Sequence, residues 1–281
     1  MSIKIRSEQR CFGGRLGFYS HESQATGTEM RFGVYLPPQA EHGPVPALYY
    51  LAGLTCTEET FLIKAGAPRF AAAHGLALIA PDTSPRGANI PGEDADWDFG
   101  TGAGFYLDAT EEPWSGHYRM ARYVNQELPP LIEGRFPVIP GLKGIFGHSM
   151  GGHGALVSAL HHPTEWHSLS AFAPITNPVA VPWGQKALPR YLGPDETRWA
   201  NWDASLLMRA RAYPGPILVD QGTEDQFLEI QLRPEALEAA AASSGQSLTL
   251  RRQQGYDHSY WFIQSFIGDH IDHHAAQLKR A

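Results

Sequence analysis

Six consecutive residues, Gly-His-Ser-Met-Gly-Gly at positions 147–152, have the types and the spacing of a reactive serine site. In the pattern Gly-x-Ser-x-Gly, the serine lies on a strained turn between a strand and a helix, and its hydroxyl stands clear of the sheet. Gly147 and Gly151 lack the Cβ atoms that would clash in such a turn. An apolar strand-like stretch precedes the pattern and a helix-like stretch follows it. We therefore predict that Ser149 is the nucleophile of an acyl-transfer reaction.

A serine hydroxyl is a weak nucleophile at neutral pH, so it needs a base, and the base needs an acid that orients it. In α/β-hydrolase folds these residues follow the chain order serine, acid, histidine. Of the thirteen histidines, those before Ser149 have the wrong order, and His153, His161 and His162 fall on the helix after the turn. His258 follows the last predicted strand and precedes the final helix, so it is the predicted base.

The acid should follow the next-to-last predicted strand, which spans residues 215–220. Asp220 still belongs to that strand, and Asp257 adjoins the base too closely in sequence for an easy side-chain contact. Spacing alone does not separate the two remaining candidates, Glu224 and Asp225, of which we prefer Asp225.

The negative charge of a tetrahedral intermediate requires two backbone N–H donors, which form an oxyanion hole. One should come from Met150, which follows the nucleophile, and the other from the loop after an earlier strand. In the segment 52–57 we select the N–H of Leu54. Cys56 lies two residues further on, where it is either a thiol near the pocket that could block activity when modified or a small buried apolar residue.

The elements that must position these residues alternate between strand and helix patterns. This alternation predicts an α/β fold, with a mostly parallel sheet covered by helices on both faces. Ligands bind beyond the carboxyl ends of such strands. Two long stretches, 82–116 and 174–203, fit neither pattern and can reach that edge, so we expect functional loops there. The predicted strands are 30–36, 46–51, 75–80, 143–147, 167–173, 215–220 and 247–253; the predicted helices are 117–132 with a break near Leu128, 151–162, 233–244 and 259–279.

Within the second loop, Trp183 and Gln185 are candidate pocket residues, with simple loop packing as the alternative for Trp183. His270, His273 and His274 share one face of the final helix. A metal site is conceivable from that spacing, but a solvated helix face is the favoured interpretation, and we predict no metal ion.

Length and composition set the broad class. A chain of 281 residues without repeats or linkers is expected to form one hydrolase domain, residues 1–281. The net charge of −7 argues against a nucleic-acid partner. No apolar run suits a secretory signal or a membrane span. The two cysteines, Cys11 and Cys56, are too few for a disulfide framework, so we expect a cytoplasmic protein.

Blocks along nearly the whole chain resemble the S-formylglutathione hydrolase, or esterase D, family. In order they are CFGG at 11–14, VYLPP at 34–38, LAGLTCTEETF at 51–61, GAGFYLDATEEPW at 102–114, YRM at 118–120, GHSMGGHGAL at 147–156, NPVAVPWGQKA at 177–187, DQGTEDQFL at 220–228 and GYDHSYWFI at 255–263. Two departures are visible. Val181 stands where the family often has cysteine, and Glu224 where aspartate is common.

The resemblance implies a serine thioesterase that converts S-formylglutathione and water to glutathione and formate, without metal or organic cofactor. It selects Asp225 as the triad acid, maps the oxyanion donors to Leu54 and Met150, and implies a homodimer. Lys64, Arg86 and Lys186 are then candidate partners for the glutathione carboxylates. The alternative is a general short-chain carboxylesterase or acyltransferase of the same fold, and a non-catalytic binding protein is a third possibility that the complete triad disfavours.

Overall fold

Short apolar runs rich in aromatic and β-branched residues form the inner strands of a single nine-stranded sheet in the computed structural model, which describes residues 2–281. The strand order is β1-β2-β3-β5-β4-β6-β7-β8-β9. β1, β2, β3 and β5 pair antiparallel, and from β5 to β9 every pair is parallel. The strands are β1 Ile3–Cys11, β2 Gly14–Glu22, β3 Glu29–Leu36, β4 Val45–Leu51, β5 Ala77–Pro81, β6 Val138–His148, β7 Leu169–Phe172, β8 Ile217–Gly222 and β9 Leu248–Gln253.

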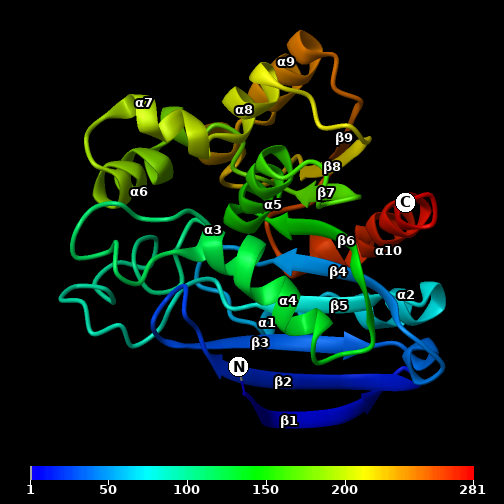
Figure 1. The fold of residues 1–281 in the computed structure, drawn as a ribbon. Coiled ribbons are helices and arrows are strands. Elements are labelled where there is room, and N and C mark those ends of the chain that lie inside the picture. The colour runs from blue at the N-terminus through cyan, green and yellow to red at the C-terminus, as the bar shows by residue number, and fades with distance from the viewer. Residues whose placement is uncertain (1) are drawn as a thin grey trace.

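Helices cover both faces of this sheet (Figure 1). α5 packs against β4, β6 and β7, whereas α10 packs against β6, β7 and β8 and also contacts α2. The helices are α1 Thr60–Lys64, α2 Ala67–His74, α3 Met120–Arg122, α4 Leu128–Glu133, α5 Met150–His161, α6 Pro182–Leu192, α7 Glu196–Trp199, α8 Ala204–Ala210, α9 Pro234–Ser244 and α10 Tyr260–Leu278. Shorter turns of 3₁₀-helix lie at Pro38–Glu41, Pro178–Ala180 and Ala200–Trp202, and π-helical turns at Tyr123–Glu127 and Leu228–Leu232.

The seven predicted strands are all present, but the sequence pattern did not reveal the hairpin of β1 and β2. Most side chains of β1 are at least partly exposed and its sequence is largely polar, so it lacks the apolar signal of a buried strand. The hairpin turns at Phe12 and Gly13, whose φ angles of 45° and 76° suit the two-residue turn that joins twisted antiparallel strands.

The two stretches that we predicted as long loops differ in their secondary structure. Residues 82–116 contain no regular helix or strand, as expected. The prediction for residues 174–203 was wrong in part, because α6 and α7 form there, with Pro182 in the first turn of α6, a position that proline tolerates. The predicted break near Leu128 is present only as a change of helix type: the chain stays helical from Met120 to Glu133, and a π-helical turn directly precedes Leu128. In Figure 1, α6, α7 and the 82–116 loop lie together beyond the ends of β4 and β6.

The expectation of a solvated histidine face on the last helix was also wrong. His270 and His274 are fully buried. Ser170 Oγ lies 2.8 Å from one ring nitrogen of each, Asp220 Oδ2 lies 3.1 Å from His270 Nε2, and Ser168 Oγ lies 2.7 Å from His274 Nδ1. These histidines therefore join α10 to β7 and β8. Among residues 2–281, no group of three or more histidine, cysteine or acidic side chains is arranged to hold a metal ion.

Stability should fall in acid because of a buried histidine on α5. Burial lowers the pKa of His153 to about 4, and its Nε2 lies 2.7 Å from the Trp202 carbonyl oxygen. Below pH about 6.5 the unfolded chain binds a proton that the folded chain excludes, so His153 alone removes about 2 kcal/mol of unfolding free energy between pH about 8 and about 5. Urea unfolding at the two pH values measures this loss.

The matched variant for that measurement is His153→Gln, which keeps a donor for the Trp202 carbonyl but has no titrating group. Its unfolding free energy should fall less than that of the wild type over the same pH interval. An equal fall in both proteins would show that His153 does not carry the effect.

Candidate active site

Ser149 lies at the sharp turn between β6 and α5, at the carboxyl edge of the sheet. Its φ and ψ angles of 57° and −119° are outside the regions that ordinary residues favour, as expected for a strained turn that presents a nucleophile. The backbone around it is firmly paired: the Ser149 N–H donates to the Phe172 carbonyl at 3.0 Å, and the Ser149 carbonyl accepts from the His153 N–H at 3.0 Å.

The glycines beside Ser149 are required by close backbone contacts. A Cβ atom on Gly147 would lie 2.3 Å from the Gly151 carbonyl oxygen, and one on Gly151 would lie 2.0 Å from the Leu51 carbonyl oxygen. Any larger residue at either position would force the turn open. These contacts confirm the expectation that residues 147–151 form a tight turn in which Gly147 and Gly151 leave no room for a Cβ atom.

Asp225 and His258 meet from two different loops. Asp225 follows β8 and His258 follows β9, and their Oδ2 and Nδ1 atoms are 2.5 Å apart. The Asp225 side chain is wholly buried, and its oxygens also accept from the Gln221 amide at 3.2 Å and from the Phe227 N–H at 2.8 Å. The carboxylate is thus held by three donors, which orient it toward the imidazole.

The other acid candidates lie elsewhere. Glu224 is exposed, and Asp257 accepts from the Ser259 N–H and hydroxyl. Asp220 sits within β8, as predicted, where Arg251 binds both of its oxygens at 2.7 and 2.6 Å. These contacts, with a hydrogen bond from His270, hold the pKa of Asp220 at about 2 against the opposing effect of burial. Only Asp225 of the four touches His258.

His148, which precedes Ser149 in the chain, lies beside His258. The His148 ring lies 4.3 Å from the His258 ring, centroid to centroid, and the Tyr260 ring borders it at 6.1 Å. Ser149 Oγ makes no hydrogen bond within residues 2–281. Such bonds often close only when substrate is bound, so this open arrangement is compatible with a serine–histidine pair.

His148 itself was missed by sequence reasoning. Its side chain is buried, and neither ring nitrogen has a partner among the described residues. Burial, and then the nearby His258, lower the pKa of His148 well below its usual value, which keeps the ring neutral. The only sequence signal was its place beside the nucleophile, where the Gly-x-Ser-x-Gly pattern accepts any residue.

The loop between β4 and α1, residues 52–59, runs close to Ser149. A Cβ atom on Gly53 would lie 3.2 Å from the Ser149 Cβ. The Thr55 and Cys56 N–H groups are paired with carbonyl groups, but the N–H groups of Leu54 and Met150 donate to no acceptor within residues 2–281. The two N–H groups that we predicted as oxyanion donors therefore have no acceptor among the described residues.

An aromatic row leads from His258 to the surface. The Phe227 ring lies 5.1 Å from His258, Trp183 lies 4.8 Å from Phe227, and the exposed Trp97 lies 5.9 Å from Trp183. Trp183 is thus buried, and the Phe227 ring separates it from His258. Phe227 was not among the residues that we predicted from sequence. Gln185 is exposed and its amide binds the Val179 carbonyl, so its side chain is directed to its own segment.

Cys56 is partly buried beside Tyr260, which begins α10 two residues after His258. Burial raises the pKa of the Cys56 thiol, although hydrogen bonds with Tyr260 and Thr60 oppose this. A raised pKa leaves the thiol protonated near neutral pH, which makes it a poor nucleophile. Cys56 is therefore a protonated thiol of low reactivity next to Tyr260.

The three cations considered for substrate binding have different partners. Arg86 donates to both oxygens of Asp82 and to the Cys56 carbonyl, and Lys186 pairs with Asp96 and Asp98. Lys64 has no ion pair within residues 2–281, and its Nζ lies 6.0 Å from the Tyr260 ring centre. Of the three, Lys64 is the one whose charge is not already balanced by a carboxylate.

Comparison with known proteins gives matches over nearly the whole chain. The family model "Putative esterase" matches residues 23–273. S-formylglutathione hydrolases of Mus musculus and Paracoccus denitrificans are 56% and 55% identical to the chain, and each alignment covers 99% of both sequences. The solved structure of an S-formylglutathione hydrolase from Agrobacterium tumefaciens superposes with a TM-score of 0.95 at 48% identity, covering 98% of this chain and 99% of that one. The predicted α/β-hydrolase fold is confirmed.

Proposed function

Because the chain belongs to the S-formylglutathione hydrolase family, we propose that it hydrolyses S-formylglutathione to glutathione and formate. The observation that carries this proposal is the match of about half of all residues, over the full length, to enzymes of that name. The site adds a chemical reason. A serine turn, two free N–H groups and a buried aspartate–histidine pair are the parts that acyl transfer through serine requires.

In the first half of the proposed reaction, Ser149 Oγ attacks the formyl carbon while His258 accepts the hydroxyl proton. Asp225 keeps the proton of His258 on Nδ1, which leaves Nε2 free as the base, and stabilises the imidazolium that forms. The N–H groups of Leu54 and Met150 bind the oxyanion of the tetrahedral intermediate. Its collapse breaks the carbon–sulfur bond, and glutathione leaves as a thiol with the proton returned by His258.

In the second half, a water molecule attacks the formyl ester on Ser149. His258 removes a proton from that water and then returns one to Ser149 Oγ, while the same two N–H groups stabilise the second oxyanion. Formate leaves and the free serine is restored. The formyl group is the smallest acyl group, which suits a serine that is buried at the turn.

Around this chemistry we propose a substrate site bordered by Trp183 and Phe227 on one side and by Cys56 and Tyr260 on the other. Lys64 is the proposed partner of a glutathione carboxylate, supported by its unpaired charge. We further propose, from the family resemblance, that residues 1–281 act as one domain in a cytoplasmic homodimer. No helix within residues 2–281 has the length and apolar character needed to cross a membrane.

Purified wild-type protein tests this function through kcat/KM for S-formylglutathione and for p-nitrophenyl acetate. We expect the glutathione thioester to be preferred by at least about 100-fold, since binding of the glutathione part is used in the transition state. A preference for the acetate ester would instead support the alternative, a general short-chain carboxylesterase or acyltransferase. In that case the serine chemistry would stand and the substrate assignment would fall.

A further inference from the structure

The loop that carries Leu54 is held by a segment far away in the sequence. Residues 82–106, which we call the clamp segment, bind the backbone on both sides of Leu54. Tyr106 Oη donates to the Ala52 carbonyl at 2.9 Å, the Thr55 N–H donates to the Gly102 carbonyl at 2.9 Å, and Thr83 Oγ1 donates to the Cys56 carbonyl at 2.6 Å. The Leu54 N–H is left free between these fixed points.

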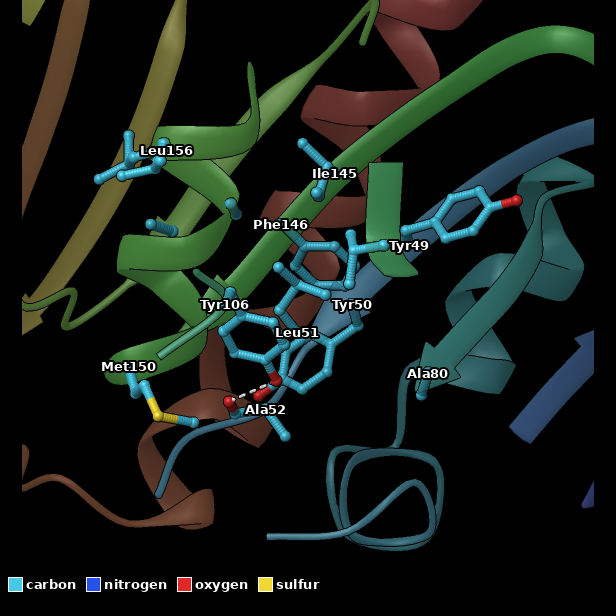
Figure 2. Close-up of a cluster of buried hydrophobic side chains, with 14 of the residues drawn as sticks. Tyr49, Tyr50, Leu51, Ala52, Ala80, Tyr106, Ile145, Phe146, Met150 and Leu156 are labelled. Carbon is cyan, nitrogen blue, oxygen red and sulfur yellow. Dashed lines mark hydrogen bonds between the residues drawn. The ribbon is translucent and has the colours of Figure 1, made fainter. Parts of the chain in front are cut away.

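Tyr106 contacts both elements that carry the proposed oxyanion donors. Figure 2 shows its ring between α5 and the end of β4, with its hydroxyl directed at Ala52 and Met150 at the same end of the cluster. A Cβ atom on Gly154, one turn into α5, would lie 2.6 Å from the Tyr106 ring. Tyr106 is only 1% exposed, so its hydroxyl cannot exchange the Ala52 carbonyl for water.

Backbone strain concentrates at the same contacts. Phe105 and Tyr106 have φ angles of 50° and 52°, and Thr55, on the loop that they hold, has a φ of 68°. Positive φ is a costly conformation for aromatic and β-branched residues, and it persists only where surrounding contacts fix it. Three such residues at these contacts indicate that tertiary contacts fix the conformation of the loop.

We propose that Tyr106 is a positioning residue for the oxyanion hole, whose hydroxyl acts through the Ala52 carbonyl to fix the direction of the Leu54 N–H. This inference rests on the proposed function. A phenylalanine would fill the same core space, so the hydroxyl is the part that the proposal explains. Burial raises the pKa of Tyr106 well above its usual value, and the group therefore remains a donor at every pH at which the enzyme works.

The test is Tyr106→Phe, which removes one oxygen atom and keeps the ring. If the Leu54 N–H loses its fixed direction, stabilisation of the oxyanion falls while ground-state binding does not. We expect kcat for S-formylglutathione to fall about 10-fold with KM within about twofold of wild type. The inhibition constant of a short alkyl trifluoromethyl ketone, which forms an oxyanion adduct with the serine, should rise by a similar factor, and that of glutathione should not change.

Tyr213→Phe is the matched control. Tyr213 is also buried and donates to a backbone carbonyl, that of Trp166, at 2.5 Å. Trp166 precedes β7 and Tyr213 precedes β8. Because these strands are parallel to β6, both residues lie toward the edge of the sheet opposite Ser149. Tyr213→Phe should lower the melting temperature without changing kcat or the ketone's inhibition constant. A general effect of a lost buried hydrogen bond would appear in both variants.

Thr83→Val supplies a second variant of the clamp segment, and it decides the matter if Tyr106→Phe does not fold. It removes the donor to the Cys56 carbonyl and should lower kcat in the same direction, with KM unchanged. The inference is overturned if Tyr106→Phe, or Thr83→Val in its place, keeps wild-type kcat and ketone inhibition, or if Tyr213→Phe loses as much. Should these variants behave like wild type while Ser149→Ala is inactive, the inference fails and the proposed function does not.

Discussion

Replacing Ser149 with alanine should lower kcat for S-formylglutathione by about 10⁵-fold or more while the protein remains folded. The loss is large because the covalent route ends: the turn between β6 and α5 carries no other nucleophile. Alanine fits the site, since it only removes a hydroxyl that makes no hydrogen bond within residues 2–281. The melting temperature should therefore stay close to that of the wild type, and steady-state kinetics with thermal unfolding measure both quantities.

Cys56→Ala is the informative companion of that variant. Cys56 is the second potential nucleophile near the site, but burial keeps its thiol protonated. Its side chain is not needed for the contacts of its carbonyl with Thr83 and Arg86. We expect Cys56→Ala to keep kcat within about tenfold of wild type. The reverse pattern, an active Ser149→Ala and an inactive Cys56→Ala, would make the enzyme a cysteine hydrolase and refute the assignment.

Asp225→Asn should lower kcat about 10⁴-fold with little change in KM. The carboxylate accepts the Nδ1 proton of His258 at 2.5 Å, and so keeps Nε2 unprotonated and able to accept the serine proton. An asparagine amide can instead donate to Nδ1, which moves the imidazole proton to Nε2 and removes the base. Because asparagine has nearly the same shape, its Oδ1 can still accept from the Phe227 N–H, whereas Gln221, which donates to the Oδ2 that faces His258, loses its acceptor.

The matched control for that variant is Glu224→Gln, at the residue that spacing alone did not separate from Asp225. Glu224 is exposed and does not reach His258, so kcat should be unchanged in this variant. If Glu224→Gln were the inactive protein and Asp225→Asn the active one, the acid would be misassigned although the nucleophile and base could stand.

The parts of the site that were predictable from sequence are those tied to local pattern and chain order. The Gly-x-Ser-x-Gly turn constrains its own backbone. A Cβ atom on Gly147 would collide with the Gly151 carbonyl oxygen, and one on Gly151 with the Leu51 carbonyl oxygen. His258 followed from its place after the last strand. The acid could not be identified from spacing, which did not separate Glu224 from Asp225. The family resemblance indicated Asp225, and Asp225 is the residue whose carboxylate contacts the His258 imidazole.

The parts that were not predictable depend on contacts between distant segments or on weak patterns. Tyr106 reaches Ala52 across 54 positions of the chain, and no local rule relates those residues. His270 and His274 have the spacing of a surface stripe, yet they are buried because Ser168, Ser170 and Asp220 satisfy their ring nitrogens. Polar residues in a helix pattern suggest solvent unless their partners are known, and those partners come from other elements.

The most direct test of the central claim is to trap the acyl-enzyme. Wild-type protein mixed with S-formylglutathione carrying a carbon-13 label in the formyl group, and quenched in acid within the first turnover, is digested and its peptides are analysed by mass spectrometry. We expect a labelled formyl group on Ser149 and none on the Ser149→Ala protein. A formyl group on Cys56, or turnover without any formyl group on Ser149, would contradict it.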